Sequence, residues 1–249
     1  MTKQSIKSGG SYRPILIKLG IVAGIVGSVA IVAIVTFVLS PPAVNLLPVP
    51  ANAIALKSKA GQQLLAQSTI KADYASLSQN FQTQKLPAYC GVASGVMVLN
   101  ALKRAAPPLN QDTFFTPEAQ KIRTPLEVAF LGMSLAQLAA LLKSHQVKVE
   151  THHAADTTIE QFRTQIKQNL ASERNFVIIN YDRAGIGQGK GGHISPLSAY
   201  HEQSDRVLIE DVSSYKYPPV WVSMSELWNA VNTKDNTTWR TRGYLLVSQ

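Results

Sequence analysis

The sequence contains a single cysteine, Cys90, at the start of a segment with the apolar spacing of a helix. Pro87 precedes the segment, and Val92, Val96 and Leu99 recur at helical intervals within it. Backbone N–H groups and the helix dipole stabilise an anion at a helix N-terminus, which lowers the pKa of a thiol placed there. Cys90 is therefore a candidate nucleophile, although a lone cysteine is more often a small buried apolar residue.

A thiol nucleophile requires a base, and the base requires a partner that orients it. His193 begins a predicted strand after a glycine-rich loop, and Asp211 ends the next strand. Adjacent antiparallel strands can bring these two side chains together. The oxyanion of a tetrahedral intermediate also requires preset donors, for which the Cys90 backbone N–H and the Gln84 side-chain amide are candidates. Each residue alone has a structural interpretation, but their types and order together are those that thiol acyl transfer requires.

The elements that must position these residues can be predicted from spacing and capping. Capping boxes are predicted at three places: Ser134–Gln137, Thr157–Glu160 and Ser223–Glu226. Strands are predicted over residues 147–150, 176–181, 193–200, 206–210 and 244–247. Helices dominate the first part and a largely antiparallel sheet the second, so we expect an α+β domain in two halves.

Three segments of the chain resemble the phytochelatin synthase family in its bacterial form. They are Gln84-Lys-Leu-Pro-Ala-Tyr-Cys90-Gly-Val-Ala-Ser94, Gly191-Gly-His193-Ile-Ser-Pro196, and Asp211-Val212 with Tyr215-Lys-Tyr-Pro-Pro-Val-Trp221. The resemblance covers residues 75–247. It implies a papain-like thiol-enzyme fold with Cys90, His193 and Asp211 as the triad and Gln84 at the oxyanion.

The resemblance further implies glutathione as the substrate. Cys90 would attack the Cys–Gly amide, release glycine and pass the γ-glutamylcysteinyl group to water or to another glutathione. The γ-glutamyl end is a zwitterion that needs one acid and one base, and Asp235 and Arg242 fit by type. The resemblance points to the same two residues and adds Gly192 as a substrate contact. It also includes Arg183, which would either hold a substrate carboxylate or brace the glycine-rich loop.

Two departures from the family favour hydrolysis over transfer. Ser214 stands where family members carry an arginine, and the cysteine-rich C-terminal extension of eukaryotic members does not follow Gln249. We expect no tightly bound cofactor and no metal site in the protein. His152 and His153 are adjacent on a predicted strand and point opposite ways, so they chelate poorly. Cd²⁺ or Zn²⁺ is expected to act through a metal–glutathione thiolate that serves as substrate.

The N-terminal part has a different composition. Residues 1–18 are basic, residues 19–39 form an uncharged apolar run long enough to cross a bilayer, and residues 40–70 are expected to be a linker to the catalytic domain, 71–249. The positive flank predicts a single-pass anchor in the cytoplasmic membrane, with the catalytic domain outside the cytoplasm. The alternative is a secretory signal that is cleaved after Ala53.

The net charge of +9 includes the basic N-terminal segment, and the remaining chain is only mildly basic. No run of basic residues with interleaved aromatics indicates a nucleic-acid partner. Two competing functions are a papain-like peptidase that processes leader peptides for a transporter and a tethered, non-enzymatic metal- or thiol-binding module. One cysteine is too few for a strong soft-metal site. The oligomeric state is left open.

Overall fold

The computed structural model describes residues 30–102 and 106–249. The chain divides into two compact units, Met1–Ser40 and Pro41–Gln249. In the first unit, residues 30–39 are helical. Within the described ranges, no helix combines the length and apolar character needed to span a membrane. Residues 1–29, which include the predicted basic segment and most of the predicted span, lie outside the described residues.

The second unit is built on one antiparallel sheet of seven strands in the order β1-β6-β5-β4-β3-β7-β2, as far as the described residues go. The strands are β1 (Ile54–Ala55), β2 (Lys148–His153), β3 (Asn175–Asp182), β4 (Gly192–His201), β5 (Arg206–Ile209), β6 (Val220–Ser223) and β7 (Gly243–Ser248). The predicted antiparallel sheet is therefore confirmed. β1 departs from the predicted order, because it precedes the helices of this unit, whereas β2 lies between α7 and α8 at the strand predicted over 147–150.

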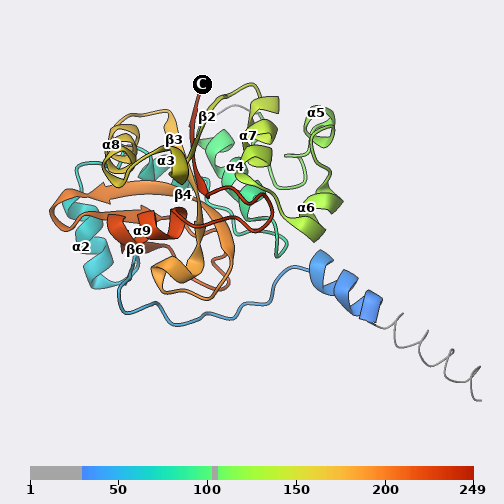
Figure 1. Ribbon diagram of the computed structural model, residues 1–249, viewed down its shortest axis with the longest axis horizontal. Coiled ribbons are helices and arrows are strands. Elements are labelled where there is room, and N and C mark those ends of the chain that lie inside the picture. The colour runs from blue at the N-terminus through green and yellow to red at the C-terminus, as the bar shows by residue number, and fades with distance from the viewer. Residues whose placement is uncertain (1–29, 103–105) are drawn as a thin grey trace, which may run out of the picture. The chain divides into compact units, whose positions relative to one another are not determined.

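Helices surround this sheet (Figure 1). They are α2 (Lys59–Gln67), α3 (Tyr74–Gln79), α4 (Cys90–Ala101), α5 (Pro117–Gln120), α6 (Pro125–Leu131), α7 (Leu135–Ser144), α8 (Ile159–Leu170) and α9 (Met224–Val231), with 3₁₀ turns at Ala154–Asp156, Arg183–Ile186 and Glu202–Ser204. The capping boxes at Ser134 and Ser223 are confirmed. The third lies one residue later than predicted, because Thr158 and Gln161 form it.

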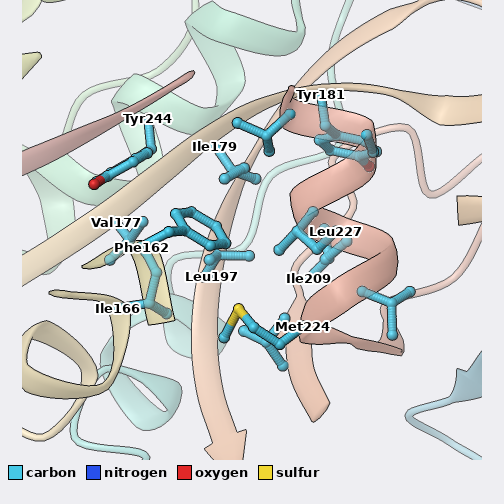
Figure 2. Packing of buried hydrophobic residues seen from close by; sticks show 14 of the residues in the cluster. Phe162, Ile166, Val177, Ile179, Tyr181, Leu197, Ile209, Met224, Leu227 and Tyr244 are labelled. Atoms are coloured by element: carbon cyan, nitrogen blue, oxygen red, sulfur yellow. The ribbon is translucent and has the colours of Figure 1, made fainter. Parts of the chain in front are cut away.

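The main apolar core lies between the sheet and helices α8 and α9 (Figure 2). Phe162 from α8 and Leu227 from α9 pack there on strand residues such as Ile179 and Ile209. Leu208, which points to the opposite face, packs with Leu56 and Trp221 in a separate cluster. This alternation along β5 buries both faces of the sheet.

The C-terminal part of the predicted linker is integrated into the fold. Residues 54–55 form β1 beside β6, and α2 follows immediately. Leu56 is buried in the cluster with Trp221, whose indole N–H donates to the Gly61 carbonyl at 3.1 Å. Apolar burial therefore holds residues 54–67 in the domain, and the predicted linker 40–70 extends too far.

Candidate active site

Cys90 is the first residue of α4, as predicted. The helix is buried almost throughout, which is typical of a helix that is apolar on all sides. Gly91 permits close packing at its start, because an added Cβ would lie 2.6 Å from the Met133 sulfur. The Cys90 side chain is itself only partly buried.

The pKa of Cys90 differs from the sequence-based expectation. Burial raises it above its ordinary value, while hydrogen bonds from the backbone of Ile194 and Gly91 and the positive charge of Arg183 act in the opposite direction. Burial has the larger effect. The resting side chain at neutral pH is therefore the thiol, and a base must take its proton.

His193 and Asp211 are brought together, as expected from their strands. His193 is the second residue of β4, and Asp211 follows β5, the neighbouring strand. The His193 Nε2 lies 2.9 Å from Asp211 Oδ1, and both side chains are buried. Because an ionised carboxylate only accepts, Nε2 carries the hydrogen and Nδ1 is left with a lone pair. The Tyr181 ring packs edge-on against the imidazole, with 5.7 Å between the ring centroids.

Arg183 fixes the other side of this aspartate. Its Nη1 and Nη2 donate to Asp211 Oδ2 and Oδ1 at 2.7 and 2.8 Å. The guanidinium also donates to Gln188 and lies over the Tyr217 ring. Arg183 is buried and does not line the cavity that contains Cys90. In this arrangement the guanidinium supports Asp211 and the loop after β3, and a contact of Arg183 with substrate stays a prediction.

These charges set the protonation of the base. Burial alone would raise the pKa of Asp211, but the charges and hydrogen bonds of His193 and Arg183 outweigh it and hold that pKa far below its usual value. Burial lowers the pKa of His193 to about 4, with Arg183 contributing in the same direction and Asp211 opposing. His193 is therefore neutral at pH 7 and can accept a proton.

Gln84 is buried beside the segment that leads to Cys90. Its amide nitrogen donates to the Pro87 and Leu86 carbonyls at 2.7 and 3.0 Å, and it lies 3.3 Å from the Tyr215 hydroxyl. Its oxygen accepts from Ser213 Oγ at 2.7 Å. In this arrangement the amide supports the chain before Cys90. The oxyanion role stays a prediction, because the Gln84 amide would have to give up a bond to the Leu86 or Pro87 carbonyl and donate to the oxyanion instead.

A cavity of about 400 Å³ contains both Cys90 and His193. Its lining is Pro87, Ala88, Cys90, Phe130, Leu131, Gly132, Met133, Asn180, Gly192, His193, Ile194, Asp235, Asn236, Thr237 and Arg242. The structure thus brings Asp235, Arg242 and Gly192 to the same cavity as the thiol and the imidazole. The acidic Asp235, the basic Arg242 and the candidate nucleophile Cys90 therefore line one cavity.

The charged pair in this cavity has well-defined neighbours. Arg242 Nη1 donates to Asn180 Oδ1 at 3.0 Å and lies 3.7 Å from Asp235 Oδ2. Asp235 Oδ1 accepts from the backbone and hydroxyl of Thr237 at 2.9 and 2.6 Å. Gly192 leaves room for the guanidinium, since an added Cβ would lie 2.5 Å from Arg242 Nη1.

Several lining residues had no signal strong enough to be singled out in the sequence. Asn180 is one polar residue within a buried strand, and that contrast could have marked it. Phe130, Leu131 and Met133 lie at the end of α6 and in the turn after it, where exposed apolar residues follow no active-site pattern. They are recognised only when the fold brings α6 beside the start of α4.

The adjacent histidines of β2 have structural partners. His152 stacks on the Tyr244 ring, and His153 Nδ1 lies 2.7 Å from the Thr241 carbonyl oxygen. Over the described part of the chain, no group of three or more His, Cys, Asp and Glu side chains is arranged to hold a metal ion. Ser214, the residue at the family's arginine position, is hydrogen-bonded to Thr83.

Comparison with known proteins gives a consistent result. The family model for phytochelatin synthase matches residues 44–244. Glutathione gamma-glutamylcysteinyltransferase 3 of Lotus japonicus is 34% identical over 216 residues, covering 84% of this chain and 43% of the relative. The enzyme named glutathione gamma-glutamylcysteinyltransferase in Schizosaccharomyces pombe is 26% identical over 204 residues, covering 80% of this chain and 49% of the relative. The chain thus spans a little under half the length of these relatives.

Among solved structures, the cysteine protease xylellain from Xylella fastidiosa aligns with a TM-score of 0.42 at 11% identity, covering 85% of this chain and 97% of that one. That degree of similarity is too low to support a conclusion. The family match covers most of the domain and includes all the residues brought to the cavity. The chain belongs to the phytochelatin synthase family.

Proposed function

We propose that this domain cleaves the Cys–Gly amide of glutathione through a thioester on Cys90. The observation that carries the proposal is the shared cavity, in which Cys90 and His193 lie together with Asp235 and Arg242. Family membership and the names of the relatives support the same substrate. We infer also that the fold is papain-like, because the thiol begins a buried helix and its base and carboxylate lie on an antiparallel sheet.

Acylation follows from the orientation of His193. Its Nδ1 accepts the thiol proton while Asp211 holds Nε2–H. The sulfur attacks the cysteinyl carbonyl carbon, and the C–N bond to glycine breaks. The imidazolium returns its proton to the departing glycine nitrogen, so free glycine leaves and the γ-glutamylcysteinyl group stays on Cys90 as a thioester.

Deacylation uses the same base. Water, or the amine of a second glutathione, loses a proton to His193 as it attacks the thioester carbonyl. The thiolate leaves and takes that proton back. Water yields γ-glutamylcysteine, and a glutathione amine yields a product longer by one γ-glutamylcysteinyl unit. Because Ser214 is uncharged, it lacks the cation that an arginine would offer an acceptor, so we expect hydrolysis to exceed transfer at low glutathione.

Recognition of the γ-glutamyl end is assigned to two buried charges. Arg242 would bind the α-carboxylate, and Asp235 would bind the α-amino group. Asn180 holds the guanidinium from one side, and Thr237 holds the carboxylate. Gly192 keeps the strand edge open beside Arg242. Salt bridges with a ligand are strong here because both side chains are largely removed from water.

Cd²⁺ or Zn²⁺ is proposed to act as part of the substrate. Two glutathione thiolates bridged by the metal present an acceptor with its thiol masked. Stimulation should then follow the concentration of the metal–thiolate complex and should disappear with an S-alkylated glutathione acceptor. Tight, stoichiometric cadmium binding by the Cys90→Ala protein in the absence of glutathione would contradict this.

Membrane attachment through residues 19–39 is proposed from the apolar run and its basic flank. The full chain should fractionate with membranes and resist salt extraction. If the mature protein in the source cells begins at Ile54, the N-terminal segment is a cleaved signal and not an anchor.

The direct test is to incubate the protein with glutathione and measure released glycine, with Cys90→Ala as the control. We expect glycine from the native protein and none above background from the variant. The leader-peptide alternative predicts cleavage of a transporter's leader peptide with no glycine release from glutathione. The names of the relatives favour glutathione.

A further inference from the structure

A second cavity adjoins the one that contains Cys90. Its volume is about 340 Å³, and it shares Leu131, Met133 and Thr237 with the catalytic cavity. Met133 contacts the start of α4 beside Cys90, and the Thr237 hydroxyl is bonded to Asp235. The two cavities therefore meet along a wall of side chains next to the proposed site for the γ-glutamyl amine.

The remaining lining is polar and carries one cation. It consists of Arg123, Ser134, Gln137 and Thr238. Arg123 is half-buried, and within the described chain its guanidinium makes one hydrogen bond, from Nε to the Gly132 carbonyl at 3.0 Å. Its two Nη groups therefore remain available to bind a carboxylate.

Polar groups for amide recognition accompany this cation. Gln137 uses its side-chain oxygen to accept from the Ser134 backbone, which leaves its amide hydrogens for a ligand. The carboxylate of Glu127, on the neighbouring helix α6, is engaged with the backbone and hydroxyl of Thr124. The cavity thus offers a guanidinium fork, amide hydrogens and hydroxyls, which suit a carboxylate attached to a peptide.

The position of the cavity identifies which part of a substrate it can hold. Neither Cys90 nor His193 lines it, so a nucleophilic acceptor bound there would not face the thioester. A donor substrate bound at Asp235 has its α-amino group beside Thr237, at the shared wall. A substituent on that nitrogen would enter the second cavity without approaching the reacting atoms.

We propose that this second cavity binds the N-terminal unit of donors longer than glutathione, namely γ-linked oligomers. This inference rests on the proposed function of the catalytic cavity. In such an oligomer, the amine next to Asp235 is acylated by a further γ-glutamylcysteinyl unit. That unit occupies the second cavity with its α-carboxylate on Arg123. The volumes agree, because about 340 Å³ is close to the 400 Å³ of the cavity assigned to the first unit.

The test compares two donors, glutathione and its γ-linked dimer (γ-Glu-Cys)₂-Gly, by the kcat/KM of glycine release. Arg123→Gln should lower the dimer-to-glutathione ratio of kcat/KM by about tenfold, as expected for loss of a charged hydrogen bond. Arg123→Lys should recover part of that loss. Arg240→Gln is the matched control, because Arg240 is an exposed arginine on the neighbouring loop that does not line this cavity.

A third donor separates binding from a structural effect. In this dimer, 4-aminobutyrate replaces the N-terminal γ-glutamyl residue, which removes only the carboxylate. The native protein should lose about tenfold in kcat/KM against the full dimer, whereas Arg123→Gln should not distinguish the two dimers. The same pattern should appear in dissociation constants measured calorimetrically with the Cys90→Ala protein.

Several results would overturn the inference. Equal effects of Arg123→Gln on glutathione and on the dimer would make Arg123 structural. A change only in the transfer-to-hydrolysis ratio with glutathione would assign the cavity to the acceptor. Equal kcat/KM of the native protein for the full dimer and the 4-aminobutyrate dimer would show that Arg123 does not bind that carboxylate. Failure of the native protein to release glycine from either donor would instead refute the proposed function, and the inference with it.

Discussion

The two groups of charged residues in the catalytic cavity and behind it are held in different ways. His193 lies on β4, Arg183 in the turn after β3 and Asp211 just after β5, and Asp211 bonds to both of the others within 3 Å. Asp235 and Arg242 come from the segment between α9 and β7 and lie 3.7 Å apart. Among the residues that the structure describes, none is a hydrogen-bond partner of the buried Arg242 Nε. The hydrogen bonds among His193, Asp211 and Arg183 are complete without a ligand. Asp235 and Arg242, here called the recognition pair, keep hydrogen-bonding groups that a ligand would use.

The largest effect is expected at the triad. His193→Ala should lower kcat for glycine release by about 10⁴-fold, because this imidazole shares the cavity of Cys90 and is the base assigned to its proton. Cys90→Ala should abolish turnover with an unchanged circular dichroism spectrum. His201→Ala is the matched control, since that histidine is buried but bonded to Ser204. Activity in His193→Ala with loss in His201→Ala would make the assignment of the base wrong.

The recognition pair should respond mainly in KM. Arg242→Gln removes the cation assigned to the α-carboxylate, so we expect kcat/KM for glutathione to fall by about 10- to 100-fold. Glutathione that lacks this carboxylate should be cleaved equally by both proteins. Arg240→Gln, an exposed change two residues away, should leave KM within error. A fall in kcat alone would show that Arg242 acts on the chemical step instead.

Two adjacent acidic residues behind the cavity, Glu210 and Asp211, are also held in different ways. Asp211 is paired with the Arg183 guanidinium, whereas buried Glu210 accepts from the Ser198 hydroxyl, and burial raises the pKa of Glu210 to about 7. The folded protein therefore holds this proton more tightly than the unfolded chain does, so the free energy of unfolding falls as pH rises from about 4.5 to 7.

Glu210→Gln should remove that slope and stabilise the protein at pH 8 by about 1–3 kcal/mol. The measurement is urea unfolding at several pH values, with Glu173→Gln, an exposed change, as the control. An unchanged slope in Glu210→Gln would mean that Glu210 does not titrate in this range.

The smallest effect concerns the acid limb of the pH profile. Only neutral His193 accepts the thiol proton, so kcat/KM should decline as pH falls through about 4. Arg183→Met removes a charge that lowers the His193 pKa, so the limb should move to higher pH by about one unit. The profile is measured only where thermal melts show folded protein. A limb that stayed in place or moved to lower pH would contradict this role of Arg183.

Local patterns in the sequence were sufficient for the triad elements. Helical spacing predicted α4 and its start at Cys90, and the strand beginning at His193 was recognised from its apolar run after glycines. The cap of α8 lies one residue later than predicted, because Thr157 and Glu160 fit the same pattern as Thr158 and Gln161. Such local signals depend only on neighbours in the chain.

Long-range pairing was not predictable in the same way. The bidentate contact of Arg183 with Asp211 depends on how β3, β4 and β5 align, and no residue near Arg183 in the sequence indicates it. The pKa of the thiol likewise does not follow from its place at a helix start, because burial of Cys90 outweighs the groups that lower this pKa. The integration of residues 54–67 depends on Trp221, which is far away in the chain.

The central claim is that Cys90 carries a γ-glutamylcysteinyl thioester during turnover. Rapid acid quenching of the protein with glutathione, followed by mass spectrometry of the peptide that contains Cys90, tests it directly. The account predicts an added γ-glutamylcysteinyl acyl group that hydroxylamine removes, that accumulates in His193→Ala only slowly, and that is absent from Cys90→Ala. An unmodified Cys90 during active glycine release, or only a mixed disulfide with the full mass of glutathione, would contradict it.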